Sequence, residues 1–201
     1  EPGWEIPWGE NPQSVERMTF WIGAGFRRLS GIDWDIPEDM RERYLCQPEQ
    51  VRQMVSEWER RASQCQPHAS HHLLARLQSS NPGVRIITLN QDGLLQRAGC
   101  QGVLEMHGRW GQWEGQRPAQ IWMGDPYPME RIETALGWLR ICDLCLVVGC
   151  SSRLQPVCDF PLEARQAGAR LSEVNPGETP LSPHCHECHR CPLETLLSRW
   201  I

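Results

Sequence analysis

The sequence predicts an α/β fold of the Rossmann type, in which a mainly parallel sheet carries helices on both faces. Short apolar runs typical of buried strands alternate along the chain with segments of helical periodicity. Strands that alternate with helices form βαβ units, and such units place their strands parallel to one another. The 201 residues suffice for one such core with a small appendage.

Four apolar runs are predicted to be strands of this sheet. They are residues 17–22 (RMTFWI), 84–89 (VRIITL), 143–149 (DLCLVVG) and 169–175 (ARLSEVN). The run 143–149 is the plainest central strand, because it is apolar throughout after Asp143.

The segments between these runs have helical spacing. In residues 49–62, Val51, Met54, Val55 and Trp58 recur at i, i+3, i+4 and i+7, which predicts an amphipathic helix. Further helices are predicted after Pro67 with Leu73, Leu74 and Leu77 buried, around residues 132–139, over residues 161–168, and over the final PLETLLSRW.

Composition argues against nucleic-acid and membrane partners. The net charge is −5 and no basic stripe is visible, so nothing indicates an electrostatic grip on nucleic acid. The longest apolar run, around residues 141–149, is too short to span a bilayer and contains Asp143. The N-terminal residues 1–18 lack the basic start and apolar core of a signal peptide and are expected to form an arm.

Ten cysteines are present, but a patterned chain of this length does not need disulfides to fold. Cys142, Cys145 and Cys150 lie in or beside an apolar run, where a free thiol behaves as a small hydrophobic group. We therefore expect a reducing, cytoplasmic location.

Small or polar residues follow each predicted strand. Residues 23–25 (GAG), 90–92 (NQD) and 149–151 (GCS) follow three strands, and Asn175 ends the fourth. Ligands of parallel sheets bind where strands end at their carboxyl edge, so these residues are predicted to form one crevice. Each segment taken alone is equally explained as a turn.

Six segments then form an ordered pattern. They are GAGFRRLSGI (23–32), TLNQDGLLQRAG (88–99), EMHG (105–108), RPAQIWMGDPYP (117–128), GCSSRLQP (149–156) and PLEARQAGARLSEVNPGETPLSP (161–183). From about Thr19 to Leu197 the chain resembles the sirtuins, which are NAD-dependent protein deacylases. The first segment, for example, is similar to their Gly-Ala-Gly-Ile-Ser-x-x-Ser-Gly-Ile loop.

The resemblance implies an NAD site at these segments. Gly23 and Gly25 lack a Cβ, so the backbone can approach a pyrophosphate beside the free N–H groups of a helix start. Ser151 is implied to contact phosphate or ribose, and Asn175 the adenosine ribose. The implied cofactor-binding positions are Gly23, Ala24, Gly25, Asn90, Gln91, Asp92, Gly149, Cys150, Ser151, Asn175, Pro176 and Pro192.

His107, Asn90 and Asp92 are the implied catalytic residues. The sirtuin motif histidine acts as a general base on a ribose hydroxyl, and imidazole suits this role because its pKa lies near working pH. Asn90 and Asp92 are implied to line the nicotinamide pocket, with Asp92 accepting from the carboxamide; the alternative is that Asp92 caps a turn. His71 is instead expected to be a packing residue.

The chain departs from the family in one visible deletion. Sirtuins carry two Cys-x-x-Cys pairs that hold zinc between the histidine motif and the Arg-Pro stretch, but only RWGQWEGQ (109–116) lies there. No metal is therefore expected, and Trp110, Trp113 and Trp122 are predicted to hold the small domain by apolar contacts. The tail HCHECHRC (184–191) remains an alternative metal site.

Other departures bear on activity. The Pro-Asp-Phe-Arg of the family's cofactor loop appears as Asp33-Trp34-Asp35-Ile36, and two motif polar residues appear as Leu89 and Leu95. The primary hypothesis is a deacylase that transfers the acyl group of an acylated protein or peptide to ADP-ribose. An NAD-cleaving ADP-ribosyltransferase or hydrolase, and a non-catalytic module that binds NAD or ADP-ribose, are the alternatives.

The expected organisation is a single catalytic domain over residues 19–201. Residues 33–80 are expected to form an inserted helical module, and residues 109–120 a shortened remnant of the zinc-ribbon region.

Overall fold

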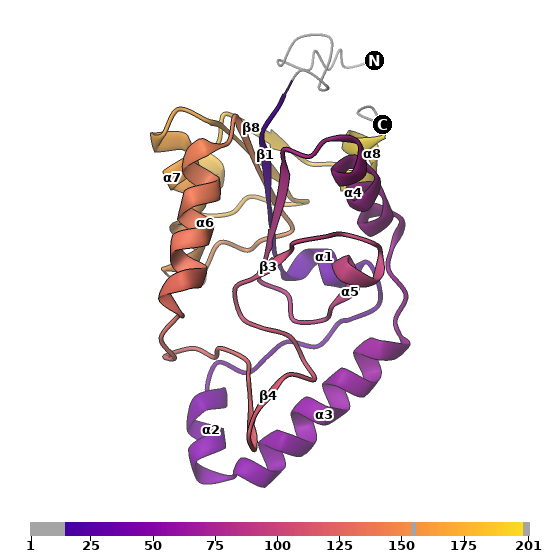
Figure 1. Cartoon of the computed structure of the whole chain (residues 1–201), viewed down its shortest axis with the longest axis vertical. Coiled ribbons are helices and arrows are strands. Elements are labelled where there is room, and N and C mark those ends of the chain that lie inside the picture. Colours follow the sequence, from indigo (N-terminus) through magenta and orange to yellow (C-terminus); the bar gives the residue numbers. More distant parts are fainter. Residues whose placement is uncertain (1–14, 154–155, 199–201) are drawn as a thin grey trace.

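The computed structural model describes residues 15–153 and 156–198, and most of the predicted N-terminal arm lies outside this range. Its centre is a six-stranded sheet in the order β3-β2-β1-β6-β7-β8, with every neighbouring pair parallel (Figure 1). The strands are β1 (Met18–Ile22), β2 (Val84–Thr88), β3 (Leu104–Glu105), β6 (Leu144–Val148), β7 (Arg170–Val174) and β8 (Glu187–His189). The predicted fold class is confirmed.

The central strands are apolar throughout because both faces of the sheet are covered. In β1, Met18, Phe20 and Ile22 face one core cluster, whereas Trp21 faces the other. Strand β6 alternates in the same way, and all five of its residues are buried. This double burial explains why the sequence shows continuous apolar runs instead of a polar alternation.

Helices form a layer on each face (Figure 1). The helices α1 (Ala24–Arg28), α4 (Ala69–Ser80), α5 (Leu94–Arg97) and α8 (Leu193–Leu197) contribute to one cluster. The helices α6 (Met129–Ile141), η2 (Val157–Asp159) and α7 (Pro161–Gln166) contribute to the other. His71 of α4 is 1% exposed, and its ring lies 4.3 Å from that of Phe26, so the expected packing role is confirmed.

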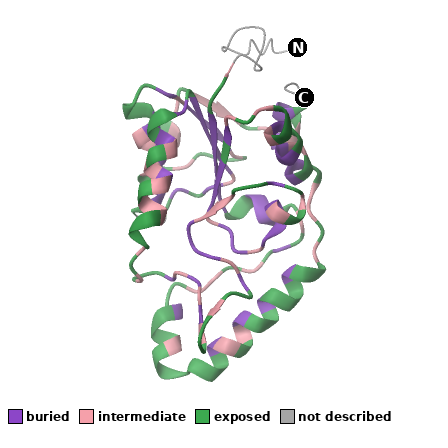
Figure 2. Ribbon diagram, in the orientation of Figure 1, coloured by how far each residue is buried: buried purple, intermediate pink, exposed green. Residues whose placement is uncertain are grey.

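A small domain lies beyond the carboxyl edge of the sheet. It contains α2 (Met40–Cys46), α3 (Pro48–Gln64) and a hairpin of β4 (Trp113–Glu114) and β5 (Arg117–Pro118) (Figure 1). Helix α3 buries only one side, as its amphipathic spacing predicts (Figure 2). Of the predicted helical module, α2 and α3 belong to this domain, whereas α4 packs against the sheet layer and α8.

The tail 184–191 takes a form that its composition did not predict. The helical turn η3 (Ser182–His184) leads into β8, which extends the sheet beside β7. Nowhere in the described part of the chain do three or more His, Cys, Asp or Glu side chains gather in a way that could hold a metal ion. Of the three cysteines of this tail, Cys188 lies in this edge strand and Cys185 and Cys191 lie just beyond its two ends.

Indole rings fill the centre of the small domain. Trp110 and Trp122 are each 5% exposed, and Trp113 packs against the same cluster. The ring of Trp110 lies 5.7 Å from that of Trp34 and 6.0 Å from that of Trp58. The predicted apolar contacts of Trp110, Trp113 and Trp122 are confirmed.

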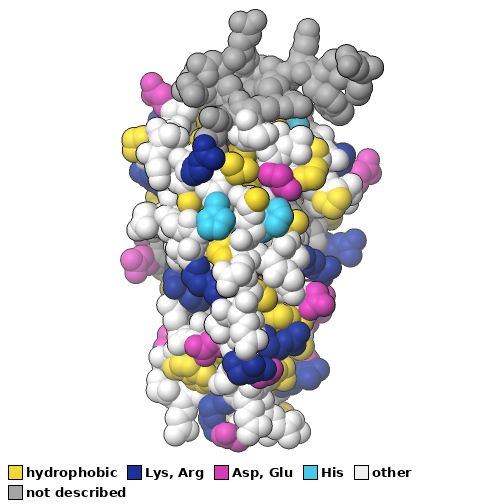
Figure 3. All heavy atoms as spheres, turned by 90° about the vertical axis from the view of Figure 1, so that its right-hand side faces the viewer, with side chains coloured by type: hydrophobic (Ala, Val, Ile, Leu, Met, Phe, Trp, Pro, Cys, Tyr) yellow, Lys and Arg dark blue, Asp and Glu magenta, His cyan; other side chains and the backbone are white. Residues whose placement is uncertain are grey.

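Two features bear on the expected partners: the charges on one face and the length of the helices. Arginine and acidic side chains are interspersed on the face shown in Figure 3, without a continuous basic stripe. Among residues 15–153 and 156–198, no helix has the length and apolar character needed to cross a bilayer.

Because these aromatic contacts stabilise the small domain, we predict that the chain folds without zinc. A chelator should leave the melting temperature unchanged, and elemental analysis of untagged protein should find well below one zinc per chain. Stoichiometric zinc that disappears when Cys185, Cys188 and Cys191 are replaced would contradict this prediction and identify the tail as a metal site.

Candidate active site

Three of the predicted loops are joined by hydrogen bonds at the carboxyl edge of the sheet. The N–H of Gly25, after β1, donates to the carbonyl of Gly149, after β6, over 2.7 Å. The side-chain amide of Asn90, after β2, donates to the carbonyl of Gly23 over 2.9 Å. The predicted convergence of these strand ends is confirmed.

The fourth loop joins the same group. The side-chain amide of Asn175, after β7, donates to the carbonyl of Cys150 over 2.8 Å. Ser151 beside it is exposed, as are Ala24 and Gly25 across the edge. At this edge, buried groups joined by hydrogen bonds therefore lie beneath exposed backbone that a ligand can contact.

Close packing requires glycine at the centre of this edge. A Cβ on Gly23 would lie 2.4 Å from the Cα of Cys150, and one on Gly25 would lie 2.9 Å from the carbonyl oxygen of Gly149. Gly149 itself has a φ of +58°, a region that favours glycine. The sequence predicted these glycines as an approach for a ligand; the structure adds that they let two loops of the protein pack together.

His107 lies under the same edge, next to the loop that carries Asn90. Its Nδ1 is 2.9 Å from the carbonyl of Leu89, and its Nε2 is 2.7 Å from the hydroxyl of Tyr127. A carbonyl only accepts, so Nδ1 carries the proton and Nε2 is the basic nitrogen. Burial lowers the pKa of His107, which keeps the imidazole neutral at pH 7.

Tyr127 is a site residue that the sequence did not identify. Burial raises its pKa to about 12, so its hydroxyl stays protonated and donates to His107. Twenty residues separate the two in the chain, and only the fold brings them together. The one available signal was the position of Tyr127 inside the segment 117–128, which resembles a sirtuin motif.

Asp92 is a buried carboxylate that is only half satisfied. Its Oδ1 accepts from the N–H of Leu94 over 2.8 Å, whereas its Oδ2 is buried and has no hydrogen-bond partner among residues 15–153 and 156–198. Burial raises the pKa of Asp92. The hydrogen bond from the N–H of Leu94 and the charge of Arg27 act in the opposite direction, but burial is the larger effect. The turn-capping alternative is therefore correct for one oxygen, and the other is available to a ligand.

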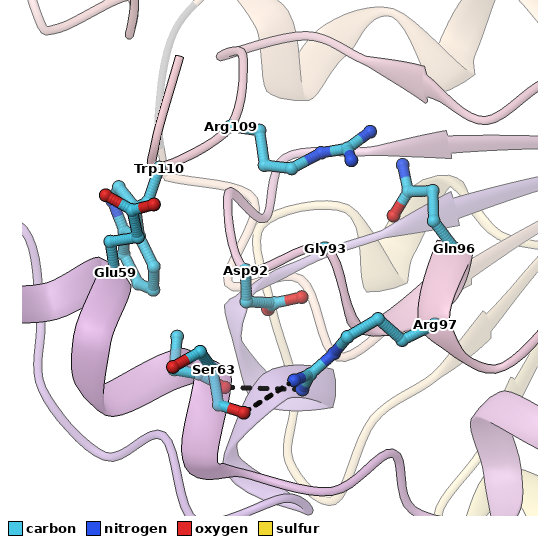
Figure 4. Close-up of a pocket in the computed structure, with 9 residues that line it drawn as sticks. Glu59, Ser63, Asp92, Gly93, Gln96, Arg97, Arg109 and Trp110 are labelled. Carbon is cyan, nitrogen blue, oxygen red and sulfur yellow. Dashed lines mark hydrogen bonds between the residues drawn. The ribbon is translucent and has the colours of Figure 1, made fainter.

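A pocket of about 330 Å³ opens beside Asp92. Figure 4 shows Asp92 between Glu59 and Trp110 on one side and Gln96 and Arg97 on the other. The guanidinium of Arg97 is already held by carbonyls at the end of α3, among them that of Ser63. Arg109 is likewise paired with Glu105, whereas Asp92 Oδ2 and Gln96 Oε1 are buried acceptors without a hydrogen-bond partner among the described residues.

The described residues fit a dinucleotide. The glycine edge offers exposed backbone, and Gln91 Oε1 and Asp92 Oδ2 are buried acceptors without a partner, as expected where a ligand supplies donors. Pro176 and Pro192 are exposed, and the carbonyl of Pro192 accepts from Thr195 at the start of α8. Their place in a cofactor site stays a prediction.

The altered cofactor loop is fixed to the small domain. Trp34 stacks on Trp110, and its carbonyl accepts from the guanidinium of Arg27 over 2.8 Å. Arg27 is 4% exposed and lies 3.6 Å from the carboxylate of Asp35. It stands where the sirtuin loop Gly-Ala-Gly-Ile-Ser-x-x-Ser-Gly-Ile has its first serine, and the sequence gave no hint of its burial.

The fold is that of a Rossmann-type protein, and a buried histidine, His107, lies at the carboxyl edge of its sheet. The chain belongs to the Sir2 family, whose model matches residues 26–116. It is 30% identical over 218 residues to NAD-dependent protein deacylase 1 of Caldanaerobacter subterraneus subsp. tengcongensis, with 87% of this chain and 88% of the relative covered.

Two solved structures share the fold. A Sir2 homologue in complex with NAD has a TM-score of 0.84 and 23% identity, covering 93% of this chain and 88% of its own. Sir2 bound to an acetylated peptide has a TM-score of 0.82 and 23% identity, covering 93% and 92% of the two chains.

We predict that Gly23→Ala destabilises the protein and weakens cofactor binding. The added methyl would overlap the backbone of Cys150, and overpacking of this kind costs about 1–3 kcal/mol. The free energy of unfolding, from denaturant titration, measures the cost.

The matched control is Gly137→Ala on α6, where an added Cβ meets nothing within 4 Å. That variant should be neutral or more stable by about 0.5–1 kcal/mol, because alanine favours helix. Equal effects of the two substitutions would contradict the close packing of Gly23.

Proposed function

We propose that this protein is an NAD-dependent protein-lysine deacylase that transfers the acyl group to ADP-ribose and releases nicotinamide. The observation that carries the proposal is the neutral, buried imidazole of His107 beside the convergent strand ends. Membership of the Sir2 family and the relative named as a protein deacylase support it.

His107 is proposed as the general base. Its Nδ1–H is held by Leu89, so Nε2 points its lone pair toward the Tyr127 hydroxyl and can accept a proton from a substrate hydroxyl that replaces Tyr127 there. The lowered pKa of His107 keeps this nitrogen unprotonated at working pH. Tyr127 fixes the ring orientation before substrate binds.

NAD supplies the reactive ribose and accepts the acyl group when it is bound. The proposed binding residues are the loops 23–25, 90–92 and 149–151 with Asn175, Pro176 and Pro192. Asp92 Oδ2 and Gln91 Oε1 support this assignment, because each is a buried acceptor with no donor in the part of the chain that the structure describes. Asn90, held by the carbonyl of Gly23, is proposed to position the reacting end of the cofactor.

The partner is an acylated protein or peptide, as in the Sir2 structure with an acetylated peptide. A cytoplasmic location is part of the proposal, supported by ten cysteines that form no disulfide. We also propose one catalytic domain over residues 19–201, with the small domain and its remnant at 109–120 built into it.

The direct test is incubation with NAD and acetyl-, succinyl- and long-chain acyl-lysine peptides. We expect nicotinamide and O-acyl-ADP-ribose, formed only when peptide is present. Nicotinamide release without peptide would instead identify an NAD hydrolase or ADP-ribosyltransferase, and tight ADP-ribose binding with NAD left intact would identify a binding module.

His107→Ala should lower the rate by about 10²–10⁴ while leaving NAD affinity nearly unchanged, because the imidazole acts on the reacting hydroxyl. Turnover gives the rate, and calorimetry gives the affinity. His72→Ala, which removes an exposed histidine of α4, is the matched control and should behave as the parent.

The pH dependence provides a second check on His107. Its pKa is lowered from 6.5, so the base stays neutral as the pH falls through 6.5 and activity should be lost only below that value. An acid limb of the pH–rate profile at or above 6.5 would contradict the buried general base.

A further inference from the structure

Two thiols face each other inside the edge described above. The sulfurs of Cys150 and Cys158 are 3.8 Å apart, and the two residues are 3% and 2% exposed. Cys150 follows β6, and Cys158 lies on η2, which leads into α7. The disulfide bond length is about 2.05 Å, so the sulfurs must approach by less than about 2 Å to bond.

Cys150 has the chemistry of a reactive thiol. The hydrogen bond between the two thiols lowers the pKa of Cys150 to about 7, with further help from the N–H of Ser152 and against the effect of burial. A thiolate is the nucleophile in cysteine oxidation, so this lowered pKa favours oxidation at Cys150.

Other cysteines of the chain lack this combination. Burial raises the pKa of Cys142 to about 11 and that of Cys185 to about 12. The thiols of Cys185 and Cys188, which have only two residues between them, donate to the carbonyls of Leu181 and Ser182. These thiols stay protonated and engaged, which makes them poor competitors for an oxidant.

The backbone of Cys150 links three parts of the cofactor edge. Its carbonyl accepts from Asn175, and its Cα packs against Gly23 so closely that a Cβ there would lie at 2.4 Å. Gly149 and Ser151 flank it in the chain. Strain from bonding the Cys150 sulfur to Cys158 would therefore act on backbone that contacts both Gly23 and Asn175.

We propose that Cys150 and Cys158 form a reversible disulfide on exposure to hydrogen peroxide, and that this modification weakens cofactor binding. The effect on the cofactor rests on the proposed function, whereas the disulfide itself does not. Because both sulfurs are buried, the oxidant must be small. A hydroperoxide is the chemical class that meets this condition.

The reaction balances as a two-electron oxidation. The Cys150 thiolate attacks a peroxide oxygen, the O–O bond breaks, and hydroxide leaves as Cys150 becomes a sulfenic acid. The sulfur of Cys158 then attacks the Cys150 sulfur, the S–O bond breaks, and water leaves. In sum, two thiols and one peroxide give one disulfide and two waters, and a dithiol such as dithiothreitol reverses the bond.

Peptide mapping tests the disulfide directly on the full chain. Trypsin cleaves after Arg140, Arg153 and Arg165, so Cys150 and Cys158 fall in separate peptides, 141–153 and 154–165. After peroxide treatment and alkylation of the remaining thiols, mass spectrometry should find these two peptides joined, with fragmentation placing the bond at Cys150. Their absence, or a bond between other cysteines, would overturn the proposal.

Calorimetry with NAD then tests the coupling. Coupling between sites typically changes affinity by about 5- to 150-fold, so the oxidised protein should bind at least about fivefold more weakly and recover with dithiothreitol. In Cys158→Ala this reversible loss should be absent, whereas the control Cys142→Ala should respond as the parent does. Equal affinity of reduced and oxidised protein would overturn the coupling.

The two hypotheses fail in different ways. If the reduced protein binds no NAD, the proposed function is contradicted, and the peptide map still decides whether the disulfide forms. If the reduced protein binds NAD and no disulfide is found at saturating peroxide, the redox site is contradicted and the proposed function stands.

Discussion

The close contact between the loops after β1 and β6 is the constraint on which the active edge depends. Gly23 has no room for a methyl group against Cys150, and Gly25 donates to Gly149 across the same gap. This contact fixes the carbonyl of Gly23, which in turn holds Asn90. The carbonyl of Cys150 holds Asn175 in the same way. Four strand ends thus become one rigid surface.

His107 depends on this surface through a single residue. Its Nδ1–H is held by the carbonyl of Leu89, the residue before Asn90, so the strand end that positions the amide also sets the tautomer of the base. Leu89 stands where sirtuins have a polar side chain, yet its backbone retains a function that any residue could perform. The chain can therefore lack the polar side chain at position 89 and still keep the hydrogen bond from His107 to the Leu89 carbonyl.

The small domain shows how aromatic packing can serve where a zinc ribbon is missing. Trp110 stacks on Trp34 of the cofactor loop, and Arg27 of α1 donates to the Trp34 carbonyl. The cluster therefore joins the small domain to the cofactor loop and to the first helix of the sheet layer. A metal would stabilise only its own ribbon, whereas these contacts tie the small domain to the site itself.

The sequence alone determined the elements whose signals are local. Apolar runs such as 84–89 and helical spacing such as that of 49–62 identified the central strands and the long helices, and parallel strand order then brought Asn90 and Asn175 to the same edge. Strand β8 escaped prediction because its polar residues are extended only by pairing with β7.

Only the tertiary structure decided the contacts between residues that are distant in the chain. The hydrogen bonds between Tyr127 and His107 and between Arg27 and the Trp34 carbonyl depend on how separate elements pack. The same packing leaves one oxygen of the buried Asp92 carboxylate without a partner among the described residues. No local pattern encodes these contacts. The same holds for Cys150 and Cys158, whose spacing in the sequence says nothing of the 3.8 Å between their sulfurs. Periodicity reports which face of an element is buried, whereas the partner on that face is set by the fold as a whole.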